Sequence, residues 1–426
     1  TNKADFDGFA NGKPDRLLRC PSLFRKMKPR DEGKNFCVSR SVNPQDQHLM
    51  EIAPVETEHF FAKYEFNTPY QLCNSDCESV TISELLKMAG VSLEELGKQS
   101  LAYTESQGHP DLRRLIAATY ETVSDNDVVL LNSPIEGIYL AARAGLEPED
   151  EVIVLSPAYD ALIHLFEHVV GRNHVKRWEF EKGSAGWELD LTRLESMLTP
   201  NTKMVVVNFP HNPTGFLPSH SFLQQLTEKL QSRNILLFAD EMYHGLVHGG
   251  REPVPSSADL HAPAIILSGL SKTYGLPGLR TGWLVIKDHV LKQRVINWKF
   301  YTSICPPGPT EFLAIAALRV HEQLRQASLQ IIENNLNIAD RFFERWRQLF
   351  EWHRPTAGST ALVKMNVASV SHLIDPLASS QGVLIQSGKT LGADDQHLRM
   401  GFGRAKFNEA LQRFEHWLTQ EVATAK

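Results

Sequence analysis

The chain has 426 residues, 42% of them hydrophobic and 22% charged, which is the composition of a globular protein with a large buried core. A formal net charge of −6 argues against a nucleic acid or an anionic membrane as partner, because both select basic surfaces. No run of apolar residues is long enough to span a bilayer, so we expect no membrane segment.

Residues 1–48 are polar, rich in charge and without sustained periodicity, so we expect an N-terminal arm, with 1–80 forming this arm and part of a small domain. A helical pattern covers Ile82–Ala89, and Pro110 opens an amphipathic helix that runs to about Thr122. Apolar strands and helices then alternate. The predicted strands are Val128–Leu131, Glu151–Leu155, Lys203–Asn208, Ile235–Ala239, Ala264–Leu267 and Gly282–Ile286. The predicted helices between them are Glu136–Leu146, Ala161–Val170 and Ser221–Ser232.

This alternation predicts an α/β fold in which a mostly parallel sheet is covered by helices on both faces. We assign it to a large domain of residues 81–310. From Thr310 a helical pattern continues to about Phe350, and strands are predicted at Ala361–Met365 and His397–Phe402. Residues 311–426 are therefore expected to form a small C-terminal α+β domain.

The cysteines indicate the redox environment. Their number is five, which is odd, and the polar N-terminus shows no apolar signal core. Reduced thiols and a cytoplasmic location are therefore expected. Cys73 and Cys77 lie close in sequence without a second pair of Cys or His, so no metal site is predicted.

Polar residues follow the predicted strands, where ligands of open α/β sheets bind. Asn212 lies in a His-Asn-Pro-Thr-Gly turn, and Asp240 follows a buried strand. A buried carboxylate needs a partner, and a pyridinium nitrogen would be one, because the ion pair keeps such a ring protonated as an electron sink. A simple turn at Asn212 and a helix cap at Asp240 are the alternatives.

Lys272 follows the next strand in the sequence Ser-Gly-Leu-Ser-Lys. Small and apolar neighbours disfavour its ammonium form, which frees the amine for Schiff-base chemistry and then for general-base catalysis. Arg280 supplies a guanidinium, the natural bidentate clamp for a phosphate. A lysine in a surface loop is the alternative for Lys272.

Taken together, these clusters resemble the class I/II aminotransferases of pyridoxal-5′-phosphate (PLP) fold type I, over roughly Tyr103 to the C-terminus. The resemblance implies an aspartate-aminotransferase-like fold: a large domain with a mostly parallel, seven-stranded type of sheet, and a small α+β domain. It implies PLP as cofactor, an amino acid as substrate, and a homodimer with shared active sites.

The resemblance also implies roles for single residues. Lys272 would hold the cofactor as a Schiff base, and Asp240 would pair with the ring nitrogen. Asn212 and Tyr243 would bind the ring oxygen, and Arg280 the phosphate.

Three further positions match the family by their local sequence. Tyr159, in Ser-Pro-Ala-Tyr, would stack on the ring. Arg399, in Leu-Arg-Met-Gly-Phe, would grip the substrate α-carboxylate. Tyr103 would reach the phosphate in the neighbouring subunit. Ordinary core, ion-pair and interface roles are the respective alternatives.

The chain departs from the family at Gly269, where many members have a serine that donates to the phosphate. Ser133 and Ser271 are the candidates for the missing donor, and Ile135 is also expected to bind the cofactor. Ser133 and Ile135 lie at the start of a predicted helix, and helix N-termini favour phosphate.

A second departure is the polar segment around Asp76 and Glu78, where ordinary transaminases have a glycine-containing segment. This segment resembles a narrower group that includes capreomycidine synthase and PLP-dependent arginine oxidases or cyclases. The two carboxylates would suit a guanidinium side chain; solvated loop charges are the alternative.

The leading hypothesis for the function is transamination at the α-carbon of an amino acid. The alternative is a PLP-dependent cyclase or oxidase of arginine or hydroxyarginine. A PLP-binding transcription regulator would need a basic helix-turn-helix module, for which residues 1–48 are short.

Overall fold

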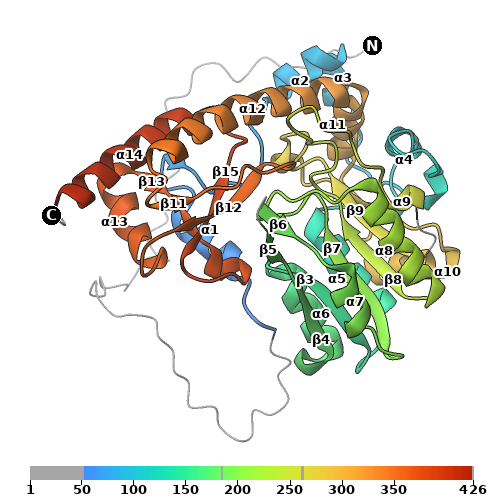
Figure 1. The fold of residues 1–426 in the computed structure, drawn as a ribbon. Coiled ribbons are helices and arrows are strands. Elements are labelled where there is room, and N and C mark those ends of the chain that lie inside the picture. The colour runs from blue at the N-terminus through green and yellow to red at the C-terminus, as the bar shows by residue number, and fades with distance from the viewer. Residues whose placement is uncertain (1–51, 184–185, 261–262, 425–426) are drawn as a thin grey trace, which may run out of the picture. The chain divides into compact units, whose positions relative to one another are not determined.

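A seven-stranded sheet is the largest sheet of the described residues (Figure 1). The computed structural model describes residues 52–183, 186–260 and 263–424, which belong to one unit of residues 51–426. The strands are β2 (Val128–Leu131), β3 (Glu151–Ser156), β4 (Val175–Glu179), β7 (Thr202–Asn208), β8 (Leu236–Asp240), β9 (Ala264–Gly269) and β10 (Gly282–Val285). Their order is β2-β10-β9-β8-β7-β3-β4, and only β10 runs antiparallel to its neighbours. The predicted fold class is confirmed.

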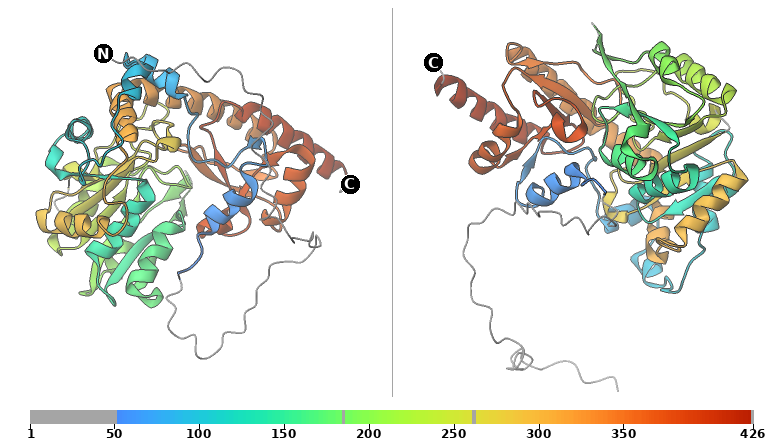
Figure 2. Two further views of the ribbon diagram at one scale, coloured as in Figure 1. Left: turned by 180° about the vertical axis from the view of Figure 1, so that it is seen from behind. Right: turned by 90° about the horizontal axis from the view of Figure 1, so that it is seen from below.

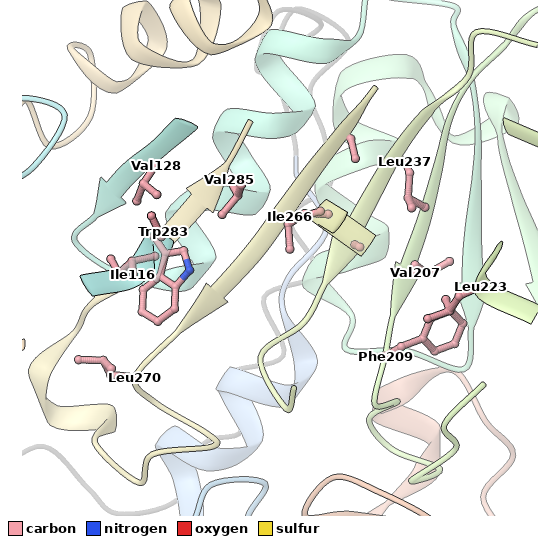
Figure 3. Packing of buried hydrophobic residues seen from close by; sticks show 14 of the residues in the cluster. Ile116, Val128, Val207, Phe209, Leu223, Leu237, Ile266, Leu270, Trp283 and Val285 are labelled. Atoms are coloured by element: carbon pink, nitrogen blue, oxygen red, sulfur yellow. The ribbon is translucent and has the colours of Figure 1, made fainter. Parts of the chain in front are cut away.

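Alternate side chains of these strands pack on opposite faces of the sheet, as period-2 geometry requires. On one face, Val205 and Val207 join a cluster with Leu223 and Leu226 of α8 (His220–Ser232). Figure 3 shows Val207 and Leu223 of this cluster. On the other face, Val206 packs in a cluster with Leu140 of α5 (Pro134–Gly145). Burying each such side chain stabilises the fold by about 1.5–3 kcal/mol. The sheet therefore has a core on both faces.

Helices predicted from the sequence cover these faces with small changes in their ends. Besides α5 and α8, the helices around the large sheet are α4 (Pro110–Ala117), α6 (Ala161–Val170), α7 (Leu191–Met197), α9 (Ser257–Leu260) and α10 (His289–Lys299). The helix from Pro110 ends at Ala117, not near Thr122 as predicted. Asp259 explains the difference, because its carboxylate accepts the backbone N–H of Thr122 at 2.8 Å and the chain there turns toward it.

The long helical stretch predicted from Thr310 to about Phe350 is divided in the structure. The structure has two helices, α11 (Gly308–Arg319) and α12 (His321–Arg345), and the chain reaches a strand by Phe350. Val320 separates them with a φ of −121°, and its side chain is 7% exposed in the main core. Burial of Val320 therefore interrupts a pattern that sequence periodicity alone continues.

A smaller antiparallel sheet forms from the C-terminal part of the chain. It consists of β11 (Phe350–Glu351), β12 (Thr360–Met365), β15 (His397–Gly401) and β14 (Gln386–Ser387), with α13 (Ser371–Gln381) and α14 (Phe407–Thr424). The earlier part of the chain adds β1 (Tyr70–Gln71), which pairs in parallel with β13 (Val383–Leu384). Figure 2 shows α1 (Glu56–Tyr64) beside these C-terminal elements, and α1 contacts the turn Gly388–Leu391. The predicted domain boundaries stay a prediction.

Shorter elements complete the described chain. They are α2 (Ile82–Ala89), α3 (Leu93–Gly97), the hairpin β5 (Glu181–Gly183) and β6 (Gly186–Glu188), and the 3-10 turns Asp125–Asp127, Arg172–His174 and Pro277–Leu279. The predicted arm, 1–48, lies outside the described residues. Within the described ranges, no helix is both long and apolar enough to cross a membrane, and no cluster of three His, Cys, Asp or Glu side chains could hold a metal.

Candidate active site

The carboxyl ends of β7, β8 and β9 meet at one edge of the large sheet. Asn208 of β7 pairs with Asp240 of β8, and Asp240 pairs with Leu267 of β9. The loops that follow these strands line a cavity of about 370 Å³, which we call the candidate site. Of the residues predicted from the sequence, those that line it are Asp76, Ile135, Tyr159, Asn212, Asp240, Tyr243, Ser271, Lys272, Arg280 and Arg399.

Asp240 is the most perturbed carboxyl group of the candidate site. It is 7% exposed, and its Oδ1 accepts the backbone N–H of Met242 at 3.0 Å. Burial raises the pKa of Asp240 to about 7, against the lowering effects of that hydrogen bond and of Lys272. Its charged form therefore needs a cation in the cavity, and a protonated pyridine nitrogen meets this need.

The lysine lies half-buried in the same cavity. Lys272 Nζ donates a hydrogen bond to Ser75 Oγ at 2.9 Å. Tyr243 is buried, and burial raises the pKa of its hydroxyl. A primary amine that lines a cavity is suited to attack a carbonyl carbon.

Arg399 and Asn212 form the buried polar side of the site. Arg399 is 1% exposed, its Nε donates to the carbonyl of Cys73 at 3.0 Å, and its Nη1 donates to Asn212 Oδ1 at 3.4 Å. Its buried Nη2 has no hydrogen-bond partner among the described residues. A buried guanidinium with an unused donor suits a carboxylate ligand, which binds arginine in a bidentate manner.

The residues expected to bind the phosphate differ in their burial and in whether they line the cavity. Ser271 Oγ is buried without a hydrogen-bond partner in the described chain, so it can donate to a ligand. Arg280 is exposed and has a left-handed backbone with a φ of +48°, which is uncommon for a residue other than glycine. Ile135, in the first turn of α5, lines the cavity. Ser133 precedes α5 without capping it, and its side chain is not among those that line the cavity.

Gly269 has a steric reason to lack a side chain. A Cβ there would lie 2.8 Å from the carbonyl oxygen of Thr281 and 3.1 Å from Pro134 Cγ. Because the carbonyl belongs to the backbone of the neighbouring strand region, a serine would require that backbone to move. The serine found in many family members would not fit here without that shift.

Besides Ser133, two predicted residues lie outside the candidate site. Glu78 accepts the backbone N–H of Ala405 at 2.8 Å and is not among the lining side chains. Tyr103 is 89% exposed and lines a separate cavity of about 320 Å³. Asp76 does line the candidate site, but its carboxylate already pairs with Arg404 at 2.7 Å.

Helix α1 and its C-cap residue Glu65 add residues that the sequence did not single out. Glu58, Phe61 and Glu65 line the cavity from one side of this segment. Glu58 accepts a hydrogen bond from the Tyr159 hydroxyl at 2.8 Å, and burial raises the pKa of that hydroxyl. Burial, and then the nearby Asp76, raise the pKa of Glu65. Their spacing of three and four residues on a helix was the only signal in the sequence.

The buried groups fit the cofactor that the sequence resemblance implies. Asp240 needs a cation, Ser271 has an unused donor, and Lys272 presents an amine, all in one cavity. The ring nitrogen of PLP would pair with Asp240, its phosphate would accept from Ser271, and its aldehyde would react with the amine of Lys272.

Comparison with known proteins agrees with this geometry. Residues 72–414 match the family "Aminotransferase class I and II", and the chain belongs to that family. An aspartate aminotransferase of Sulfurisphaera tokodaii is 30% identical over 245 residues, 55% of this chain and 61% of that protein. The chain therefore matches under two thirds of that relative's length. Capreomycidine synthase of Streptomyces vinaceus is 27% identical over 79% of this chain and 86% of its own.

Solved structures share the fold. A PLP-dependent aminotransferase from Streptococcus suis superposes with a TM-score of 0.81 at 26% identity, covering 87% of this chain and 98% of its own. The PLP-dependent cyclase OrfR has a TM-score of 0.81 at 24% identity, covering 90% of this chain and 100% of its own. The second likeness is evidence for the fold alone.

Proposed function

We propose that the protein is a PLP-dependent enzyme that acts at the α-carbon of an amino acid, with transamination as its most general reaction. The observation that carries this proposal is that Lys272, Asp240 and Arg399 line one cavity. An amine, a buried carboxylate and a buried guanidinium are the groups needed for a PLP aldehyde, its ring nitrogen and a substrate carboxylate.

Each cofactor contact has a residue to make it. Asp240 would hold the ring nitrogen protonated, while Asn212 and Tyr243 would bind the ring oxygen and Tyr159 would cover one ring face. Ser271, Arg280 and the start of α5, with Ile135 in its first turn and Ser133 just before it, would hold the phosphate. When bound, PLP supplies an electron sink that stabilises negative charge at the substrate α-carbon.

The protein itself orients the substrate and moves its proton. Arg399 binds the α-carboxylate with its free Nη2, which fixes the α-carbon relative to Lys272. The free Lys272 amine takes the proton from the substrate α-carbon as general base and can deliver it to a different atom.

A cyclase or oxidase acting on arginine or hydroxyarginine is the second candidate. It is supported by the similarity to capreomycidine synthase and by the carboxylates of Glu58, Glu65 and Asp76 in the cavity lining. The structure changes the expected partners of a guanidinium. Glu78 is outside the cavity and Asp76 is engaged by Arg404, which leaves Glu58 and Glu65 of the α1 side.

A homodimer in the cytoplasm is also proposed. Several large apolar side chains are exposed, among them Leu101 and Tyr103 at 89% and Tyr301 at 87%. Exposed aromatic and aliphatic side chains of this size are typical of interfaces. Tyr103 would then contact the phosphate bound by the partner subunit.

Two measurements test the proposal. Protein supplied with PLP should absorb at roughly 400–430 nm, and borohydride should fix the cofactor on Lys272. Labelling of a different lysine would overturn the assignment. Asp240→Asn should keep the cofactor but lose most of the α-proton exchange, since a neutral amide cannot hold the ring nitrogen protonated.

Mass spectrometry of products separates the two candidate reactions. Amino acids should be supplied with and without a 2-oxo acid and oxygen. Conversion that depends on the 2-oxo acid identifies transamination. Conversion of L-arginine without a 2-oxo acid identifies the cyclase or oxidase, and Glu65→Gln should then weaken the binding of L-arginine more than that of L-alanine.

A further inference from the structure

Ser75 is a buried hydroxyl in contact with the proposed reactive amine. It is 9% exposed, lines the candidate site, and its Oγ accepts a hydrogen bond from Lys272 Nζ at 2.9 Å. The two residues are 197 positions apart in the chain, so the contact is formed by tertiary structure. No role for this serine follows from the family motifs described above.

Backbone contacts fix the segment of residues 72–78 that carries Ser75. Leu72 accepts the backbone N–H of Gly401 at 2.7 Å, and the backbone N–H of Glu78 donates to Gly403 at 2.8 Å. The carbonyl of Ser75 itself accepts the hydroxyl of Ser359 at 2.6 Å. Both ends and the middle of segment 72–78 are therefore bound to the small-sheet side of the cavity.

Glycines allow this segment to lie unusually close to β15 and the residues after it. A Cβ on Gly401 would lie 1.7 Å from the carbonyl oxygen of Asn74. A Cβ on Gly403 would lie 2.4 Å from the carbonyl oxygen of Asp76. Backbone contacts on both sides of Ser75 leave little freedom for its hydroxyl, which is therefore positioned before any ligand binds.

The Ser75 hydroxyl also acts on a second group of the site. It accepts from the Lys272 amine, and, against the larger raising effect of burial, it lowers the pKa of Tyr243. A hydroxyl has one donor and two acceptor positions, so its own hydrogen stays available while it accepts from Lys272. An alanine would fill nearly the same space but could neither accept nor donate.

We propose that Ser75 is a positioning residue whose hydroxyl holds the free amine of Lys272 in the orientation needed to attack a carbonyl carbon. This inference rests on the proposed function of Lys272. In the step concerned, a C=N bond forms between Nζ and the PLP aldehyde carbon. The aldehyde oxygen leaves as water with the two hydrogens of the neutral amine.

The test measures how fast Lys272 captures PLP, and it requires no substrate. Protein freed of cofactor with hydroxylamine is mixed with PLP, quenched with borohydride at set times, and analysed by mass spectrometry of the peptide that contains Lys272. Ser75→Ala should slow the labelling about three- to tenfold, the effect of one neutral hydrogen bond. Ser75→Thr, which keeps the hydroxyl, should restore most of the rate.

Ser79→Ala is the matched control, because Ser79 is an exposed serine directly after segment 72–78. It should label at the rate of the unaltered protein. Equal rates for Ser75→Ala and the unaltered protein would overturn the inference. Equal slowing in Ser75→Ala and Ser75→Thr would also overturn it, since packing and not the hydroxyl would then be responsible. Failure of the unaltered protein to label at Lys272 would instead reject the proposed function.

Discussion

Asp240 illustrates at the residue scale how burial prepares a carboxyl group for a cationic ligand. Burial raises its pKa from 3.8 to about 7 in the protein without cofactor. The neutral form is therefore favoured in the folded state, and this contribution to stability is fully present below about pH 4. It is lost as the pH rises toward 7, because the unfolded chain releases the proton first.

The raised pKa of Asp240 leads to a prediction for the protein without cofactor. As pH rises from 4 to about 7, Asp240→Asn should gain stability relative to the unaltered protein, since the amide has no charge to bury. Urea unfolding at several pH values measures the difference between the two free energies of unfolding. Ser79→Ala, an exposed change that removes no titratable group, serves as control and should show no such trend. A difference independent of pH would contradict a raised pKa.

Arg399 gives a second prediction at this scale. Arg399→Ala should weaken the binding of amino acids about tenfold or more, because a charged hydrogen-bonded contact is lost. Cofactor content should stay close to that of the unaltered protein, since Arg399 is assigned to the substrate. Titration of the visible absorption band with L-alanine and L-arginine measures the affinity. Unchanged affinity would place the carboxylate site elsewhere, and Arg404 would be the next candidate.

At the scale of elements, the candidate site depends on contact between segment 72–78 and β15. Gly401→Ala should destabilise the protein by about 1–3 kcal/mol, because its Cβ would overlap the carbonyl oxygen of Asn74. The same change should slow capture of PLP by Lys272, since Ser75 would be displaced. Thermal unfolding and timed borohydride labelling measure the two effects.

Gly97→Ala is the control for this substitution. Gly97 lies in α3, and a Cβ there would meet no atom within 4 Å, so alanine should be neutral or slightly stabilising. If Gly401→Ala behaved like Gly97→Ala, the close approach of the two backbones would not be important for the site.

At the scale of the whole molecule, the exposed Tyr103 is the test of a shared active site. We expect a dimer by light scattering. Tyr103→Phe should keep the dimer mass but weaken PLP retention about tenfold, because one hydrogen bond to a charged phosphate is lost. Dilution followed by absorbance gives the cofactor affinity. A monomer of undiminished affinity would contradict sharing between subunits.

The sequence alone determined the parallel sheet and the residues that follow its strands. Buried β-branched runs such as Val205–Val207 predict the strands, and polar residues such as Asp240 and Lys272 directly after a strand predict the ligand-binding edge. These signals are local, so they can be read without knowing which parts of the chain meet. For the same reason, the helices with clear periodicity, such as Ala161–Val170, were predicted with their observed ends.

Only the tertiary structure decided which polar residues reach the cavity. Asp76 and Glu78 are two residues apart in sequence, yet one lines the cavity beside Arg404 and the other binds the backbone of Ala405. The contact between Ser75 and Lys272 depends on glycines more than three hundred residues further along the chain than Ser75. Such partners are brought together by packing of distant segments, and neither composition nor periodicity carries that information.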